Sequence, residues 1–243
     1  MDNDLLYLSG NDIPFIEAQI TIHQPTIKEI AYIGEEAFFV GCELFNFSKD
    51  NLSEEDKISL ENQTNFDILI AILRERNAVM QRNRNCVEMV LALIFPEYSF
   101  EWTEKEILLK KEDEAHSINN ENFEQFKKII NKMFGFEKNI EGNYNPSGDM
   151  AKRIVDKLNK RHQILSAEKG EHKKIDILSR YLSILTVGQH KDMNSLLQYT
   201  VYQLYDEFER YRLKLDYDIY LKASLAGAKD LKEVEDWMKD IHS

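Results

Sequence analysis

Proline and glycine are both scarce in this sequence, at 4 and 9 of its 243 residues. Sandwich and barrel folds need many tight turns, and these two residues are the usual turn formers, so their scarcity argues against such folds. Hydrophobic residues make up 43% and charged residues 30%, as in an ordinary soluble globular protein, and the chain is long enough to bury a sizeable core. The composition predicts a mostly helical protein.

Cysteine and long apolar runs are also rare. Cys42 and Cys86 each lie in an apolar helical pattern, so we expect buried thiols in a reducing, intracellular compartment rather than a disulfide framework. The longest apolar run, 89–95, is far shorter than the roughly 20 residues that span a bilayer, and the first residues do not resemble a signal peptide. The expectation is a cytosolic protein that does not bind membranes.

Basic residues are outnumbered by acidic ones, 31 to 43, which gives a formal net charge of −12. Proteins that bind nucleic acids draw much of their affinity from clustered Lys and Arg, so DNA and RNA are disfavoured as partners. The acidic balance favours basic partners without specifying one.

The motifs of catalysis and cofactor binding are missing as well. None of the six histidines lies three or four residues from another His or Cys, and the glycines form neither a P-loop nor a dinucleotide-binding turn. No nucleophile elbow appears, and pairs of acids such as 35–36, 54–55 and 216/218 are typical of solvated helix faces. We therefore expect no catalytic, cofactor or metal site, although the fold could still assemble an enzyme site in a groove between two portions of the chain.

The N-terminal portion, residues 1–135, is predicted to be α+β. Alternating apolar residues predict a short strand within 14–23, and helical spacing predicts a helix over 25–40 that ends near Gly41. The further predictions are a short helix after a capping box at Ser53, a helix over 66–94 with a break near 83–85, a hairpin over 98–109, and a helix capped by Asn119 or Asn120 and closed by Gly135. The strand near 16–23 could join the hairpin in one small sheet.

A linker is predicted at 136–149, where glycines and the pair Asn145–Pro146 interrupt the pattern. The remaining portion, 150–243, is predicted to be entirely helical. Its predicted helices cover 150–167, 175–187, 193–225 and 231–241, with stops at Gly170, Gly188 and Gly227 and caps at Asp192 and Asp230.

Five tyrosines lie in the stretch from Thr200 to Tyr220. Helical spacing predicts one inward stripe with Tyr205 at its edge, made of Leu197, Val201, Leu204, Phe208, Tyr211 and Leu215. Three tyrosines fall off this stripe: Tyr202, Tyr217 and Tyr220. Because tyrosine joins an apolar ring to a polar tip, these three either cover a second helix of the same chain or are exposed for a partner.

The residues from 193 to 241 resemble the C-terminal part of tail assembly chaperones from tailed bacteriophages of Gram-positive hosts. The likeness rests on the runs Tyr-Gln-Leu-Tyr-Asp (202–206), Asp-Ile-x-x-Lys-Ala (218–223), Ala-Gly-Ala (226–228) and Trp-Met (237–238). The opening residues 20–39 resemble the strand, proline and amphipathic helix that begin those proteins.

This resemblance implies a non-enzymatic protein of the host cytoplasm that binds the tape measure protein, keeps it soluble and promotes assembly of tail-tube protein around it. It implies no catalytic residues, and it leaves a homo-oligomer open. Trp237 and the three off-stripe tyrosines are the candidate partner-binding residues. The alternative function is a structural minor tail or connector component of the virion.

Overall fold

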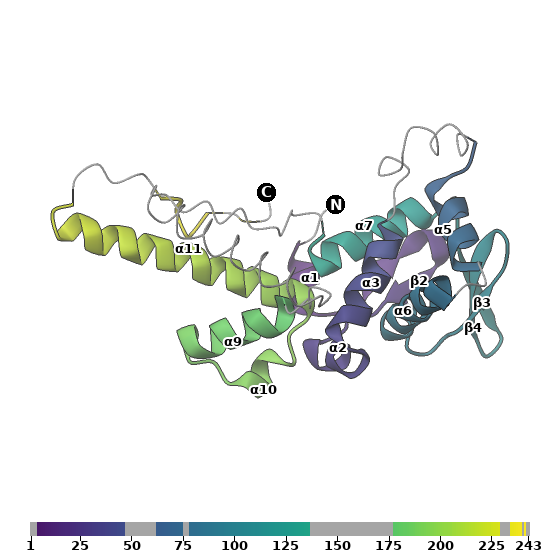
Figure 1. Cartoon of the computed structure of the whole chain (residues 1–243), viewed down its shortest axis with the longest axis horizontal. Coiled ribbons are helices and arrows are strands. Elements are labelled where there is room, and N and C mark those ends of the chain that lie inside the picture. Colours follow the sequence, from purple (N-terminus) through teal and green to yellow (C-terminus); the bar gives the residue numbers. More distant parts are fainter. Residues whose placement is uncertain are drawn as a thin grey trace.

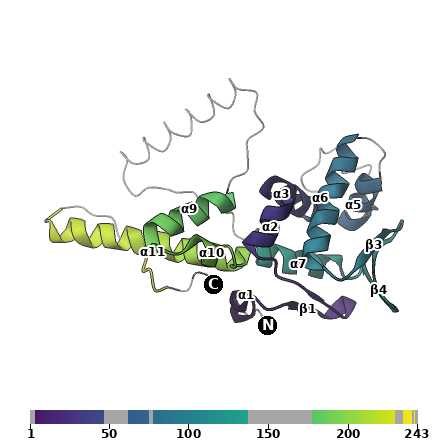
Figure 2. The same cartoon turned by 90° about the horizontal axis from the view of Figure 1, so that it is seen from below.

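The computed structural model describes residues 4–46, 62–74, 78–136, 177–228, 234–239 and 241, with the backbone alone for Val79 and Met80. The fold is mostly α, with a small α+β part formed by the N-terminal half and helices in the C-terminal half, as the sequence predicts. Figures 1 and 2 both show one long helix, α11, extending away from the α+β part. None of the helices within the described ranges is both long and apolar enough to cross a membrane.

The chain begins with a helix and a hairpin: α1 (Asp4–Ser9), β1 (Ile13–Phe15), the 3-10 turn η1 (Ile16–Ala18) and β2 (Ile20–Ile22). The predicted short strand within 14–23 is present as β2, and a second strand that was not predicted, β1, pairs with it in antiparallel fashion, with Ile13 opposite Ile22. Gln19 reverses the chain in the left-handed region, at φ 55°. The alternation of apolar residues is real, but the turn lies in its middle.

The predicted helix over 25–40 is divided into α2 (Ile27–Ile33) and α3 (Glu35–Phe45). Gly34 separates them at φ 88°, a conformation that favours glycine. Gly41 does not end the second helix. It lies where α3 packs against α6 (Ala78–Ile94), and a Cβ at this position would be 2.6 Å from the carbonyl oxygen of Cys86. A glycine is needed here for close helix packing rather than for a helix stop.

The predicted helix over 66–94 consists of α5 (Asn65–Arg74) and α6. Residues 83–85, the predicted break, lie inside α6, so that prediction is wrong. The short helix predicted after Ser53 falls outside the described residues.

The predicted hairpin is present as β3 (Ser99–Trp102) and β4 (Glu106–Lys111). A third antiparallel strand, β5 (Glu114–Asn119), pairs with β4. The sequence did not predict it, because strand prediction relies on alternating apolar residues and Ile118 is the only buried residue of β5. The prediction that the first strand and the hairpin share one sheet is wrong, because β1 and β2 form one sheet and β3, β4 and β5 form another.

Helix α7 (Phe123–Phe134) is the predicted amphipathic helix, and Gly135 closes it in the left-handed conformation as expected. Its N-terminal cap position is Asn122 rather than Asn119 or Asn120. The Asn122 side chain closes the turn from β5, because it accepts a hydrogen bond from the Asn119 amide and donates one to the Ser117 carbonyl.

The described part of the chain after residue 176 contains three helices: α9 (Ile177–Gln189), α10 (Met193–Leu196) and α11 (Val201–Leu225). Asp192 caps α10 as predicted, by accepting from the Ser195 amide, whereas Gly188 lies inside α9 instead of ending it. The prediction of a helix over 231–241 is wrong for the described residues 234–239, because they are not helical. The predicted helix over 150–167 falls outside the described residues.

The helix predicted over 193–225 is interrupted at 197–200 by the N-terminal half. The carbonyl groups of Leu197 and Tyr199 accept hydrogen bonds from the amides of Lys28 and Ile27, at 2.9 and 2.8 Å. Thr200 also forms a β-bridge with Thr26. These backbone bonds compete with helix continuation, so the long pattern divides into α10 and α11.

One apolar core joins both halves of the chain. Phe126 of α7 lies near its centre, with ring centroids 5.9, 5.3 and 6.3 Å from those of Phe15, Phe45 and Phe95. The same core contains buried residues of the C-terminal half: Leu178, Leu182, Leu185, Leu196, Val201 and Leu204.

Nearly all of the predicted linker 136–149 is outside the described residues, and the division into 1–135 and 150–243 stays a prediction.

Candidate partner-binding surface on helix α11

The first turn of α11 is fixed by a capping box. Thr200 accepts a hydrogen bond from the Gln203 amide, and the Gln203 side chain accepts one from the Thr200 amide. The same side chain donates to the carbonyl of Leu8 in α1, at 2.7 Å. The start of α11 is therefore tied to the N-terminal helix through its own cap.

Tyr202 lies in the core of the described structure, with 8% of its surface exposed. Its ring centroid is 5.4 Å from that of Tyr7, and its hydroxyl donates to the Asp4 carboxylate at 3.1 Å. Lys132 also reaches Asp4, at 2.8 Å. Burial and the neighbouring Asp4 carboxylate raise the pKa of Tyr202, which keeps the phenol neutral. Its ring therefore covers a second helix of the same chain, one of the two roles considered above.

Helix α9 packs on the first half of α11 through aromatic side chains. The Tyr181 ring is stacked on Phe208, with centroids 3.8 Å apart, and meets Tyr205 edge to face at 5.5 Å. Near the end of α9, a Cβ at Gly188 would be 2.2 Å from the Tyr211 hydroxyl. The two helices are therefore in close contact as far as Tyr211.

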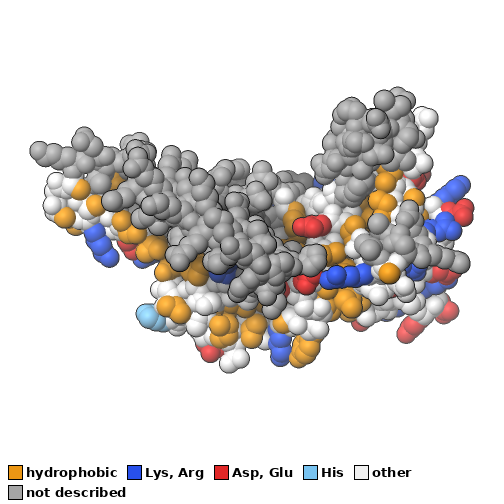
Figure 3. Space-filling model, viewed as in Figure 1, with side chains coloured by type: hydrophobic (Ala, Val, Ile, Leu, Met, Phe, Trp, Pro, Cys, Tyr) orange, Lys and Arg blue, Asp and Glu red, His pale blue; other side chains and the backbone are white. Residues whose placement is uncertain are grey.

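Beyond Tyr211, α11 is not covered by α9, and apolar side chains are exposed. The exposed fractions are 44% for Leu215, 57% for Ile219, 44% for Leu221 and 80% for Leu225, and Val187 at the end of α9 is 73% exposed. Figure 3 shows hydrophobic side chains along the part of α11 that extends from the body. The prediction of Leu215 as an inward residue is wrong, because the helix that covers the stripe ends too early.

The remaining candidate tyrosines, Tyr217 and Tyr220, lie on this same half of α11, beyond the end of α9, and are half-buried. Leu213 is buried on the same half, with 2% of its surface exposed. Their role in binding a partner stays a prediction.

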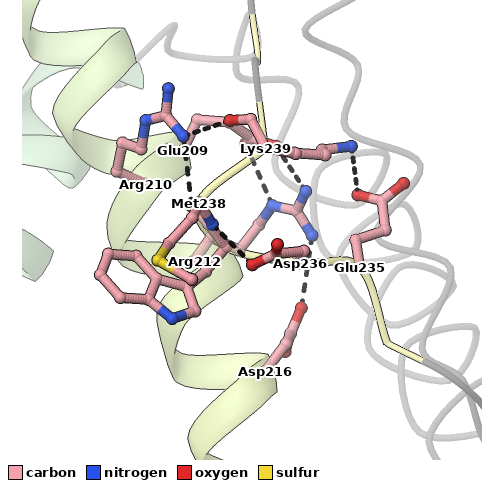
Figure 4. A network of polar contacts seen from close by, with 9 residues as sticks. Glu209, Arg210, Arg212, Asp216, Glu235, Asp236, Met238 and Lys239 are labelled. Atoms are coloured by element: carbon pink, nitrogen blue, oxygen red, sulfur yellow. Dashed lines mark hydrogen bonds and ion pairs between the residues drawn. The ribbon is translucent and has the colours of Figure 1, made fainter.

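Trp237 lies in the segment 234–239, which is held beside α11 (Figure 4). Arg210 donates hydrogen bonds to the backbone carbonyls of Trp237, at 3.1 Å, and Lys239. Trp237 is half-buried, and Met238 beside it is 69% exposed. The segment is thus attached to α11 mainly through its backbone.

Charged pairs lie next to this segment on α11. Arg212 pairs with Glu209 and with Asp216, the latter at 3.4 Å. Burial, together with Glu209 and Glu235, raises the pKa of Asp216 despite the neighbouring Arg212. The acidic groups here are held close together by one arginine.

The described residues contain no group of three or more His, Cys, Asp or Glu side chains arranged to hold a metal ion. One shallow surface depression has a volume of about 440 Å³ and is lined by Asp67, Lys105, Asn119, Asn120 and Glu121. Both thiols are buried, and burial raises the pKa of Cys42 and of Cys86, which disfavours the reactive thiolate.

Comparison with known families matches residues 170–242 to the family model described as the YomV second domain, a phage-derived family. The matched part contains α9, α10 and α11, which indicates a phage protein. The comparisons with curated proteins and with solved structures gave no match.

Proposed function

We propose that this protein is a non-enzymatic tail assembly chaperone of a bacteriophage, which binds the tape measure protein in the host cytoplasm and promotes tail-tube assembly. The observation that carries the proposal is the position of the exposed apolar side chains. Leu215, Ile219 and Leu225 lie on one projecting helix, inside the part of the chain that matches the phage-derived domain.

Contiguous exposed apolar side chains mark interaction surfaces, and a helix can bind another helix through apolar residues spaced three and four apart. The chain resembles tail assembly chaperones, whose partner is long and helical, and its net charge of −12 would keep a complex with such a partner dissolved.

The test is co-expression of this protein with the tape measure protein and the tail-tube protein of the same phage. We expect the soluble fraction of the tape measure protein to rise and the two proteins to co-purify. A tape measure protein that stays insoluble and does not co-purify would refute the proposal.

A minor tail or connector protein of the virion is the competing function. Mass spectrometry of purified particles separates the two, because a chaperone leaves before the particle is complete. A fixed copy number in finished particles would favour the structural role.

A further inference from the structure

One side of α11 carries a single row of large side chains along about half of its length. Phe208, Tyr211, Leu215 and Ile219 are three or four residues apart, the spacing that places side chains on one face of a helix. The first two are half-buried and the last two are exposed. The row therefore begins inside the protein and continues outside it.

Helix α9 covers the first part of this row and ends where the second part begins. Tyr181 is stacked on Phe208, and Gly188, next to the last residue of α9, meets Tyr211. Residues 212–225 of α11 continue for about 20 Å beyond this point, at 1.5 Å per residue. Val187 adds an exposed apolar side chain at the end of α9.

We propose that Leu215 and Ile219 form a seat for an amphipathic helix of a partner protein, which lies along α11 as a continuation of the line of α9. The seat extends an intramolecular helix interface that already exists, so an occupant at the usual helix separation of about 8–10 Å would meet the same kind of surface as α9 does. This inference deepens the proposed function, on which it rests for identifying the occupant as a segment of the tape measure protein.

The net charge of the chain, rather than the charges beside the seat, favours a basic helix over a second copy of this chain. Lys214 pairs with Asp218 at 3.2 Å and Arg212 with Asp216 at 3.4 Å, so the nearest flanking charges are balanced within the chain. Two copies, each with a net charge of −12, would repel one another, whereas a helix with Lys or Arg beside its apolar residues is attracted. The occupant is therefore a helix of another protein with apolar residues three and four apart and basic flanks.

The test uses the full chain and a fluorescein-labelled model peptide of about 20 residues, made of Leu and Lys in an amphipathic helical pattern, with a scrambled peptide of the same composition as its control. Binding is measured by fluorescence anisotropy. The double variant Leu215→Glu/Ile219→Glu is compared with the wild type and with Ile16→Glu, which changes an exposed apolar residue in η1. Circular dichroism melting checks that each variant is folded.

The substitution by Glu distinguishes electrostatic attraction of the peptide from binding through apolar contact. Extra carboxylates strengthen a purely electrostatic association with a Lys-rich peptide, but they weaken one that depends on apolar contact. We expect the double variant to bind at least about tenfold more weakly, a difference of about 1.4 kcal/mol, and Ile16→Glu to bind as the wild type does. Equal or tighter binding by the folded double variant, or equal binding of the scrambled peptide, would overturn the inference.

Two further measurements separate this inference from the proposed function and from self-association. Wild-type protein that binds the patterned peptide at the seat, yet does not co-purify with the tape measure protein, would support the seat and refute the function. Sedimentation that shows a wild-type dimer and a monomeric Leu215→Glu/Ile219→Glu variant would assign the seat to a second copy and overturn the inference.

Discussion

The carboxylate of Glu35 caps a helix through a residue that lies 143 positions later in the chain. Its Oε1 accepts a hydrogen bond from the amide of Leu178 at 2.6 Å, in the first turn of α9. The amides of a first helical turn have no partner within the helix, so an acidic side chain there satisfies a donor and opposes the positive end of the helix dipole. The position of α9, and with it the end of the seat on α11, depends on this contact between the two halves.

Glu35→Ala should therefore destabilise the protein by about 1 kcal/mol, the usual cost of losing a helix cap. Urea unfolding followed by circular dichroism measures this change. The control is Glu36→Ala, since the neighbouring Glu36 is more than half exposed and pairs with Arg82 on the surface. Equal effects of the two substitutions would contradict a capping role for Glu35.

Substitution of Tyr202 tests its place in the fold. Tyr202→Ala removes a buried ring from its contact with Tyr7, and we expect a loss of about 3–5 kcal/mol in the free energy of unfolding, as for other buried aromatic residues. Tyr202→Phe keeps the ring and loses only the hydrogen bond to Asp4, with a cost of about 1 kcal/mol.

Tyr220→Ala is the matched control, because Tyr220 is only half-buried on the projecting half of α11. Its effect on stability should be much smaller than that of Tyr202→Ala. If Tyr220→Ala leaves stability intact and weakens binding of the tape measure protein, Tyr220 contributes to the partner surface. The reverse order of stabilities would contradict the assignment of Tyr202 to the core.

Gly41→Ala should be destabilising although alanine is the better helix former. The new methyl group would lie 2.6 Å from the Cys86 carbonyl oxygen and 2.7 Å from a Val90 methyl group, so α3 and α6 would have to move apart. We expect a cost of about 1–3 kcal/mol, measured as a lower midpoint of urea unfolding.

Gly188→Ala provides the comparison for Gly41→Ala, since its new methyl group would meet the ring end of Tyr211 rather than backbone. The Tyr211 side chain lies on the partly exposed face of α11 and can turn away. The loss in the free energy of unfolding should therefore be smaller than for Gly41→Ala. A stabilising Gly41→Ala would show that helix propensity outweighs the close approach of α3 and α6.

Local patterns of side chains predicted the elements that depend on local physics. The amphipathic helix α7 with Gly135, the hairpin of β3 and β4, and the Asp192 cap are all present. The interruption before α11 was not predictable in this way, since it depends on hydrogen bonds from Ile27 and Lys28, which lie far away in the sequence. Glycine at 41 likewise resembles a helix stop until the neighbouring helix is known.

The candidate surface was predicted only in part for the same reason. Periodicity placed Leu215 on the correct face of α11, but the exposure of that face depends on where α9 ends. Tyr202 lies off the predicted stripe and is buried because α1, which the pattern did not indicate, covers a second face of the first turn. A helix pattern gives the direction of each side chain, and only the tertiary structure gives its neighbours.

Glu29 should contribute to stability in a pH-dependent way. Burial alone would raise the pKa of this carboxyl, but the Thr26 amide and hydroxyl donate hydrogen bonds to it, both at 2.7 Å, and His23 lies 3.5 Å away. Together these partners lower the pKa of Glu29 in the folded protein. A carboxyl with a lowered folded pKa adds stability above its unfolded pKa, and this stability is lost as the pH falls through the folded value.

Glu29→Gln keeps a side chain that can complete the capping box but cannot ionise. Its free energy of unfolding should therefore fall less steeply than that of the wild type as the pH decreases below about 4.5, the usual value for a glutamate, and the two proteins should differ more at pH 7 than at pH 3. Urea unfolding at a series of pH values measures both slopes. Parallel curves would show that the Glu29 carboxylate is no more stabilised in the folded protein than in the unfolded chain, and that Thr26 and His23 contribute nothing to holding its charge.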